Sequence, residues 1–297
     1  MSDERRITSS RSFLFLLFLA SALRNCAPNG FVDKFHAGWL FGPVMRRPTL
    51  ALIALLSLSP AASALVGGAE VVRGTGAGRH IVMIISTRGS LCTGTAIARD
   101  LVLTGGHCVA PAATYRVLLP DIKPPGLAIR SIAIHPRYNP KDYASGRVTA
   151  DVALLKLEQP LPASVVPATV APVTSVTPGD RFVIAGYGGT SPDSEAGNGV
   201  PRAAALIATG KPGTLQIRLF DPATRDQRSG LGACTGDSGG PAFVENSGTF
   251  AVIGVVSWST GAASTAGCGG LTGVTPLAIY RGWVVEQAKK MGTVIAP

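Results

Sequence analysis

The stretch that decides the fold lies at residues 234–241 and reads CTGDSGGP. Its serine, Ser238, is followed by two glycines, and glycine marks tight turns where the backbone comes close to a ligand. Backbone N–H groups on such a turn can point at a developing oxyanion. Taken alone, a serine of this kind is more often a plain turn residue. The stretch becomes a candidate active site only together with other segments.

Two further segments supply the side chains that a reactive serine needs. Residues 101–108 (LVLTGGHC) place His107 directly after an apolar strand and beside a cysteine. Residues 151–157 (DVALLKL) place Asp151 at the start of another apolar strand. The chain order His, Asp, Ser is that of one known arrangement of the serine triad. The sequence therefore predicts that these three side chains act together.

Composition and spacing indicate an all-β fold. Hydrophobic residues make up 46% of the 297 residues, enough for a large core, and 36 glycines with 22 prolines favour short strands joined by turns. Apolar spacing predicts one helix near residues 279–291, and the proline-rich residues 160–179 are expected to link two halves. Strands are expected at 80–87, 91–98, 101–104, 115–119, 127–134, 152–157, 181–186, 202–209, 214–220 and 250–258.

The net charge of +10 is spread along the chain. The 27 Lys and Arg residues form no basic run and no stripe interleaved with aromatic residues. Nucleic-acid binding is therefore not expected.

The N-terminus contains two segments that resemble targeting signals. A start at Met45 gives two arginines, an apolar run and the small-residue site Ala62-Ser63-Ala64, which together predict a signal peptide over 45–64. Residues 1–44 are then an upstream extension or a misplaced start. The alternative is a start at Met1, with the apolar run Phe13–Leu23 as signal or anchor. We expect a secreted, extracellular or periplasmic mature chain without a stable membrane span, since Phe13–Leu23 is too short to cross a bilayer.

The cysteine count agrees with removal of the leader. The chain has five cysteines, and Cys26 lies in the segment that would be lost. The remaining four are Cys92, Cys108, Cys234 and Cys268. An exported chain meets an oxidising compartment, so two disulfides are the natural interpretation. Zinc is the alternative, but no CxxC or HxxxH spacing occurs, and neither a metal nor a cofactor is expected.

These motifs together resemble the chymotrypsin/trypsin-like serine proteases over essentially all of residues 65–297. The GDSGGP run is highly specific, while the histidine motif has two glycines where the family usually has alanines. The resemblance implies two six-stranded antiparallel β-barrels, about 65–170 and 171–297, with the active site between them and a C-terminal helix. Disulfides common in animal members are missing, which favours a bacterial-type secreted member.

The resemblance also assigns roles to residues. It implies that Ser238 is the nucleophile, His107 the general base and then acid, and Asp151 the group that orients the imidazole. The N–H groups of Gly236 and Ser238 would form the oxyanion hole. It further implies that Cys92 pairs with Cys108 and that Cys234 pairs with Cys268.

Two more expectations follow from the family pattern. A new N-terminus at Leu65 would pair its amine with Asp237 and order the oxyanion loop. Gly232 would be the floor of an uncharged specificity pocket, which predicts cleavage after small to medium apolar residues rather than after Arg or Lys. The substrate-binding residues would be Gly232, Ala233, Ser257, Trp258, Ser259 and Gly273.

Three other functions remain as alternatives at this point. They are a catalytically silent homologue acting as a secreted binding module, an esterase on the same scaffold, and a structural exported protein. The preferred interpretation is a monomeric hydrolase that carries out proteolysis. Its partners would be a polypeptide substrate and, in some circumstances, a protein inhibitor.

Overall fold

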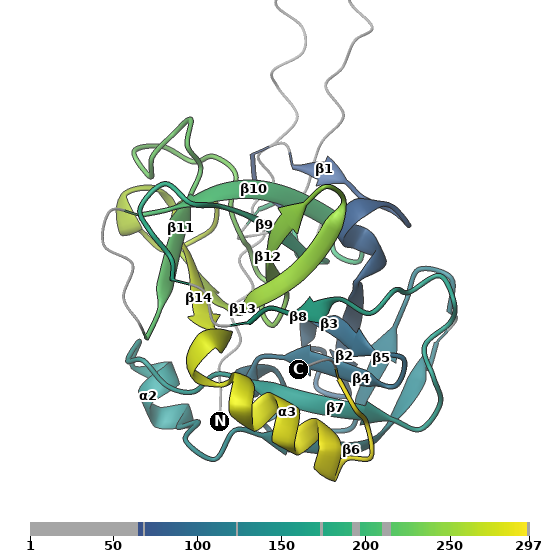
Figure 1. Ribbon diagram of the computed structural model, residues 1–297. Coiled ribbons are helices and arrows are strands. Elements are labelled where there is room, and N and C mark those ends of the chain that lie inside the picture. Colours follow the sequence, from purple (N-terminus) through teal and green to yellow (C-terminus); the bar gives the residue numbers. More distant parts are fainter. Residues whose placement is uncertain are drawn as a thin grey trace, which may run out of the picture. The chain divides into compact units, whose positions relative to one another are not determined.

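The computed structural model describes residues 65–67, 69–122, 124–172, 175–191, 197–209 and 215–295 (Figure 1). The expected upstream extension and signal peptide lie outside these residues. The strands are β1 (Glu70–Val71), β2 (Ile81–Ser86), β3 (Leu91–Ala98), β4 (Leu101–Thr104), β5 (Tyr115–Leu118), β6 (Leu127–Ile134), β7 (Ala153–Leu157), β8 (Thr169–Val170), β9 (Arg181–Gly186), β10 (Arg202–Ala208), β11 (Ile217–Phe220), β12 (Pro241–Asn246), β13 (Thr249–Ser259) and β14 (Thr272–Pro276). The α-helices are α1 (Gly106–Val109), α2 (Pro140–Ala144) and α3 (Arg281–Lys290), and 3-10 turns span Gly76–Arg79, Ala262–Ser264 and Leu277–Ile279.

The first barrel closes in the strand order β2-β3-β4-β7-β6-β5, with every neighbouring pair antiparallel. Its strands are rich in Val, Ile and Leu, which suit a pleated and buried surface. Side chains such as Val82, Val102 and Leu155 point into its interior cluster. The opposite faces of the same strands, including Leu103 and Leu154, pack in a second cluster that reaches residues of the other barrel.

The second barrel closes in the order β9-β10-β11-β14-β13-β12, because β12 pairs back onto β9. Along β10, buried and partly exposed residues alternate as expected for a strand with one face in a core. β1 and β8 attach at β10 and β13. Figure 1 shows this barrel above the first, and the expectation of two six-stranded antiparallel barrels is confirmed.

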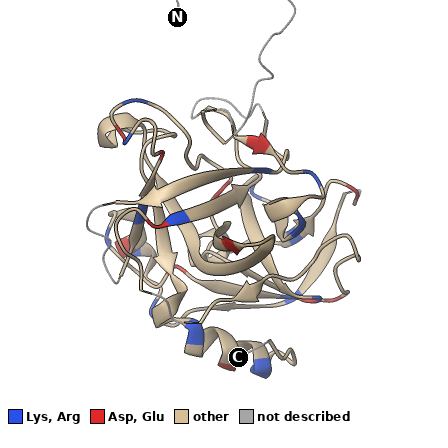
Figure 2. Cartoon of the chain, turned by 45° about the horizontal axis from the view of Figure 1, so that its top comes forward, with Lys and Arg blue, Asp and Glu red and all other residues tan. Residues whose placement is uncertain are grey.

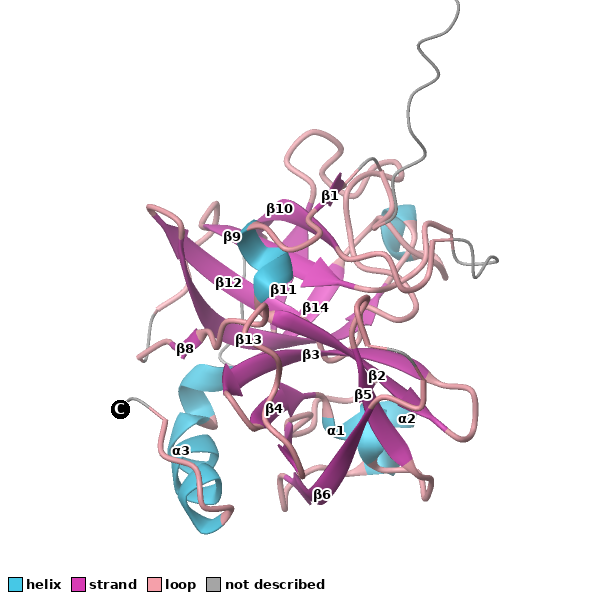
Figure 3. Ribbon diagram, turned by 90° about the vertical axis from the view of Figure 1, so that its right-hand side faces the viewer, coloured by secondary structure: helices cyan, strands magenta, loops and turns pink. Residues whose placement is uncertain are grey.

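Each end of the described chain crosses to the other barrel. The start precedes the first barrel but pairs with the second, and the end follows the second barrel but packs on the first. Near the start of the described chain, Val66 bridges to Gly232, and β1 pairs with β10 of the second barrel. At the other end, α3 contacts β7 of the first barrel. Figure 3 shows α3 at the left of the view, beside the first barrel. The buried Lys156 Nζ donates to both Asp100 and Thr293, so the segment after α3 is tied to the first barrel. These crossings fix the barrels against one another around the cleft.

The charged residues are distributed over many elements. In Figure 2 the Lys and Arg residues lie on separate strands, loops and helix α3 rather than in one patch. Among the helices that the structure describes, none is long and apolar enough to cross a membrane.

Candidate active site

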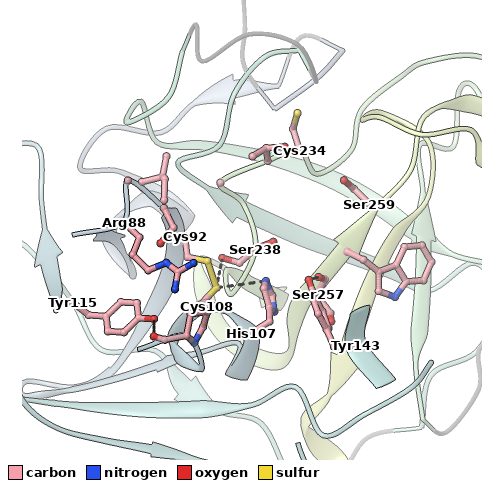
Figure 4. A pocket seen from close by; sticks show the side chains of 17 residues that line it. Arg88, Cys92, His107, Cys108, Tyr115, Tyr143, Cys234, Ser238, Ser257 and Ser259 are labelled. Carbon is pink, nitrogen blue, oxygen red and sulfur yellow. Dashed lines mark hydrogen bonds between the residues drawn. A yellow bond between two sulfur atoms is a disulfide. The ribbon is translucent and has the colours of Figure 1, made fainter. Parts of the chain in front are cut away.

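Three connections bring the predicted triad residues together. His107 lies on α1, directly after β4, and Asp151 directly precedes β7. β4 and β7 are antiparallel neighbours, with Thr104 opposite Ala153, so the end of one strand lies beside the start of the other. Ser238 comes from the second barrel, on the turn before β12. Ser238 and His107 line the same cavity of about 630 Å³ (Figure 4).

Asp151 is held on three sides and is only 1% exposed. Its Oδ2 lies 2.7 Å from His107 Nδ1, and its Oδ1 accepts the His107 backbone N–H at 2.9 Å. Ser257 Oγ donates to Oδ2 at 2.5 Å. Charge-assisted hydrogen bonds of this kind are strong and directional. They orient the imidazole with Nδ1 toward the carboxylate, which leaves Nε2 for other chemistry.

The nucleophile candidate and the imidazole line the same cavity without a hydrogen bond between them. Ser238 is partly exposed in the cavity, and within the described ranges no hydrogen bond joins its Oγ to His107. In proteins without substrate such contacts are often long and tighten only when the reacting complex forms. The arrangement is therefore compatible with proton transfer from Ser238 to His107.

The turn that carries Ser238 leaves two backbone donors available. Gly236 has φ of +97°, a conformation that residues with a side chain rarely adopt. Its carbonyl accepts from Thr93 Oγ1 at 2.8 Å, which holds the peptide in place. Among the residues that the structure covers, the N–H groups of Gly236 and Ser238 have no acceptor. These are the two donors expected for an oxyanion hole.

Asp237 is buried and does not line the cavity. Its carboxylate accepts the N–H groups of Gly188 and Cys234, each at 2.8 Å. Burial raises the pKa of Asp237 to about 7, although the two backbone donors oppose the shift. Within the described part of the chain this carboxylate has no ion-pair partner. Leu65 is 1% exposed, and its neighbour Val66 bridges to Gly232, six residues before Ser238.

The residues expected to bind substrate fall into two groups. Ser257, Trp258 and Ser259 line the cavity. The remaining three are buried and do not line it, namely Gly232, Ala233 and Gly273.

The indole of Trp258 packs against Gly273, one of the residues expected to bind substrate. Trp258 and Gly273 are cross-strand neighbours on β13 and β14. A Cβ at Gly273 would collide with the indole, so the ring lies flat against this glycine. A Cβ at Gly232 would lie 3.0 Å from Gly269 Cα, so this glycine is also closely covered. The two glycines expected to line the specificity pocket are therefore both closely packed.

Both expected disulfides are present. Cys92 is bonded to Cys108 and Cys234 to Cys268. The first lies beside His107 in the cavity wall, and the second joins the segment before Ser238 to the loop after β13. Bonded sulfurs are not thiolate ligands, so the cluster of Cys92, His107 and Cys108 does not provide the sulfur donors that a zinc site uses.

Tyr143 belongs to the site, although the sequence analysis did not identify it. Its ring stacks on His107 with 4.4 Å between centroids and 10° between planes, and its hydroxyl donates to the Ser257 carbonyl at 2.9 Å. Burial raises the pKa of Tyr143, so it stays neutral. Tyr143 lies on α2, whose start is marked by Asn139 and Pro140, with the Asn139 side chain accepting the Lys141 N–H. Asn139 and Pro140 together indicate the start of a helix, but nothing in the sequence indicates that Tyr143 contacts His107.

The sequence of this chain is similar to those of known proteins. The sequence profile of the family described as Trypsin matches residues 65–284. Transmembrane protease serine 9 of Rattus norvegicus is 28% identical over 257 residues, which cover 80% of this chain and only 23% of the rat protein. Seminase of Drosophila melanogaster is 28% identical over 229 residues, covering 72% of this chain and 80% of the fly protein.

A solved structure supports the fold. Human heparin binding protein superposes with a TM-score of 0.59 at 22% identity, over 78% of this chain and all of that one. The two sequence relatives come from animals. The comparisons therefore do not support the expectation of a bacterial-type member, and missing disulfides alone do not identify one.

Proposed function

Because the chain belongs to the trypsin family of serine proteases, we propose that it is an endopeptidase that cuts polypeptides through a covalent acyl-enzyme. The observation that carries the proposal is the hydrogen bond between the buried Asp151 and His107 Nδ1, with His107 and Ser238 lining the same cavity. Nucleophile, base and orienting carboxylate are the three parts that this chemistry requires.

The proposed reaction begins with attack of Ser238 Oγ on the carbonyl carbon of the scissile bond. His107 Nε2 takes the hydroxyl proton, and Asp151 stabilises the imidazolium that forms. The negative oxygen of the tetrahedral intermediate accepts the N–H groups of Gly236 and Ser238. When the C–N bond breaks, His107 passes its proton to the departing amine. Water then attacks the acyl-enzyme by the same route, which releases the carboxylate product and restores Ser238.

The first experiment combines covalent labelling of the active-site serine with measurements of substrate turnover. A serine-directed phosphonate should modify Ser238 of the wild-type protein, located by mass spectrometry, and should not modify His107→Ala. The wild-type protein should hydrolyse peptide as well as ester substrates, whereas an esterase would hydrolyse esters alone. A folded wild-type protein that neither reacts with the phosphonate nor hydrolyses peptides would contradict the proposal and favour a binding module.

We also propose that activation uses the buried Asp237. Cleavage before Leu65 would free an amine at a residue that is already buried and lies close in the chain to Val66, the partner of Gly232. The nearby positive charge of Arg202 offsets only part of the cost of ionising this buried carboxylate, and an amine in contact with it would lower that cost further. N-terminal sequencing of the exported protein should give Leu65 as the first residue, and a different first residue would contradict this step.

The proposal also covers which peptide bonds the protein cleaves. The uncharged Gly232 and the indole on Gly273 favour small to medium apolar residues before the scissile bond. A peptide-library profile checks this, and dominant cleavage after Arg or Lys would contradict it.

The two disulfides suit secretion into an oxidising compartment. We expect a monomer that meets polypeptide substrates and protein inhibitors there.

A further inference from the structure

The cavity has two unlike walls. One wall is formed by β13 and the turn before β12, with Trp258, Thr235 and Gly236. The other is formed by the first barrel and carries the Cys92–Cys108 disulfide, Tyr115 and Arg88. Figure 4 shows the Arg88 side chain extending from its turn, with the guanidinium next to the Cys92–Cys108 disulfide in that view.

The proposed reaction assigns a different part of the substrate to each wall. The acyl part must keep its carbonyl oxygen at the N–H groups of Gly236 and Ser238 and lie along β13. The departing amine must reach His107, which protonates it. Because His107 and Cys108 are adjacent on α1, the leaving-group side faces the wall of the disulfide. This assignment rests on the proposed function.

The backbone that carries Arg88 is held firmly. It lies in the β2–β3 turn, where Ser86 Oγ accepts the N–H groups of Arg88 and Ser90 at 3.2 Å each. Thr87 exchanges hydrogen bonds with Thr114, its N–H donating to the Thr114 carbonyl at 3.0 Å. These bonds fix the backbone of the turn, and the exposed Arg88 side chain extends from it.

The charge of Arg88 is unbalanced within the cavity. Among the residues that line it, Arg88 carries the permanent charge, and no Asp or Glu is present. No ion pair joins Arg88 to an acid in the described ranges. Burial raises the pKa of neighbouring Tyr115, whose hydroxyl donates to the Pro111 carbonyl, so this ring stays neutral. A cation without an anion in a cleft attracts anionic ligands.

We propose that Arg88 binds a carboxylate carried by the leaving-group side of the substrate. The guanidinium presents a planar set of donors that matches a carboxylate. That carboxylate comes either from an Asp or Glu within the first few residues after the scissile bond, or from the free C-terminus of a short leaving peptide. The protein then selects its cleavage sites from both walls of the cavity, by size on the acyl side and by charge on the other.

The test uses quenched fluorescent peptides that share one acyl part. One series places Glu or Gln at the first, second or third position after the scissile bond, with an amidated C-terminus. A second series compares free and amidated C-termini on a neutral leaving peptide. In one of the two series we expect kcat/KM to be about fivefold higher with the carboxylate than without it. The series that responds identifies the source of the carboxylate, and the ratio should fall at high salt.

Two variants test whether Arg88 causes the preference for a carboxylate on the leaving-group side. In Arg88→Gln the ratio between acidic and neutral peptides should fall to about one. Arg130→Gln removes an exposed arginine on β6 of the same barrel that does not line the cavity, and it should keep the wild-type ratio. Wild-type cleavage of neutral peptides with no carboxylate preference would overturn this inference alone. Failure to cleave any peptide would overturn the proposed function together with it.

Discussion

Replacing Gly236 by Ala should separate catalysis from binding. At φ of +97° an alanine is strained by about 1–3 kcal/mol. Its Cβ would also lie 2.8 Å from Gly188 Cα, and that contact is with backbone that cannot rotate away. Gly188 donates its N–H to Asp237, so the collision pushes directly on the turn that carries both proposed oxyanion donors.

The expected effect is on the transition state. Moving one donor off the oxyanion should lower kcat by about 100- to 1000-fold, or about 2.7–4 kcal/mol, while KM changes little. Steady-state kinetics with an amide substrate gives both constants, and thermal denaturation measures the accompanying loss of stability.

Gly248→Ala is the matched control for backbone strain. Gly248 lies in the β12–β13 hairpin with φ of +80°, and nothing lies within 4 Å of its missing Cβ. This variant should lose stability and keep its kcat. A folded Gly236→Ala protein with kcat near that of the wild type would refute the oxyanion assignment, as would an equal loss of kcat in Gly248→Ala.

Three further predictions concern the triad, the ring stacked on it and the activation site. Ser238→Ala should lower turnover by several orders of magnitude and keep a cooperative thermal transition, since the triad acts as a unit; turnover close to that of the wild type would contradict the proposed nucleophile. Tyr143→Phe should keep the stacking on His107 and lose only the bond to the Ser257 carbonyl, so its kcat should fall less than that of Tyr143→Ala; equal kcat values in both variants would show that the stacked ring does not position the imidazole. The unprocessed chain should lose stability as pH rises from about 4 through 7, because the pKa of Asp237 is raised to about 7 and the folded state must then bury a charge. Asp237→Asn should lack this pH dependence in thermal denaturation, and the same slope in both proteins would point to another group.

The residues of the proposed chemistry could be read directly from the sequence. Ser238, His107 and Asp151 each stand in a short motif whose neighbours are close in the chain. Long apolar runs were also readable, and the bounds predicted for β3, β4, β6 and β9 match the structure. Such strands carry their own signal, because β-branched and apolar residues fill a pleated surface on both faces.

The strands that complete the second barrel could not be predicted from their own residues. β12 begins with a proline, and β14 contains a glycine and ends with a proline, so neither has a strong intrinsic preference. Both are strands because they lie on either side of β13. β8 has two residues inside the segment expected to be a linker, and it forms by pairing with β13.

The features that distinguish this site also depend on contacts far apart in the sequence. No local pattern relates the residues that meet there: Tyr143 stacks on His107, the indole of Trp258 packs on Gly273, and Arg88 lines the same cavity as the Cys92–Cys108 disulfide. A motif determines which chemical groups a chain possesses. The packing of the two barrels decides which side chains line the cleft, which ones hold the catalytic groups in place and which ones give the cleft its charge. Only that packing sets the distances between segments that are far apart in the sequence.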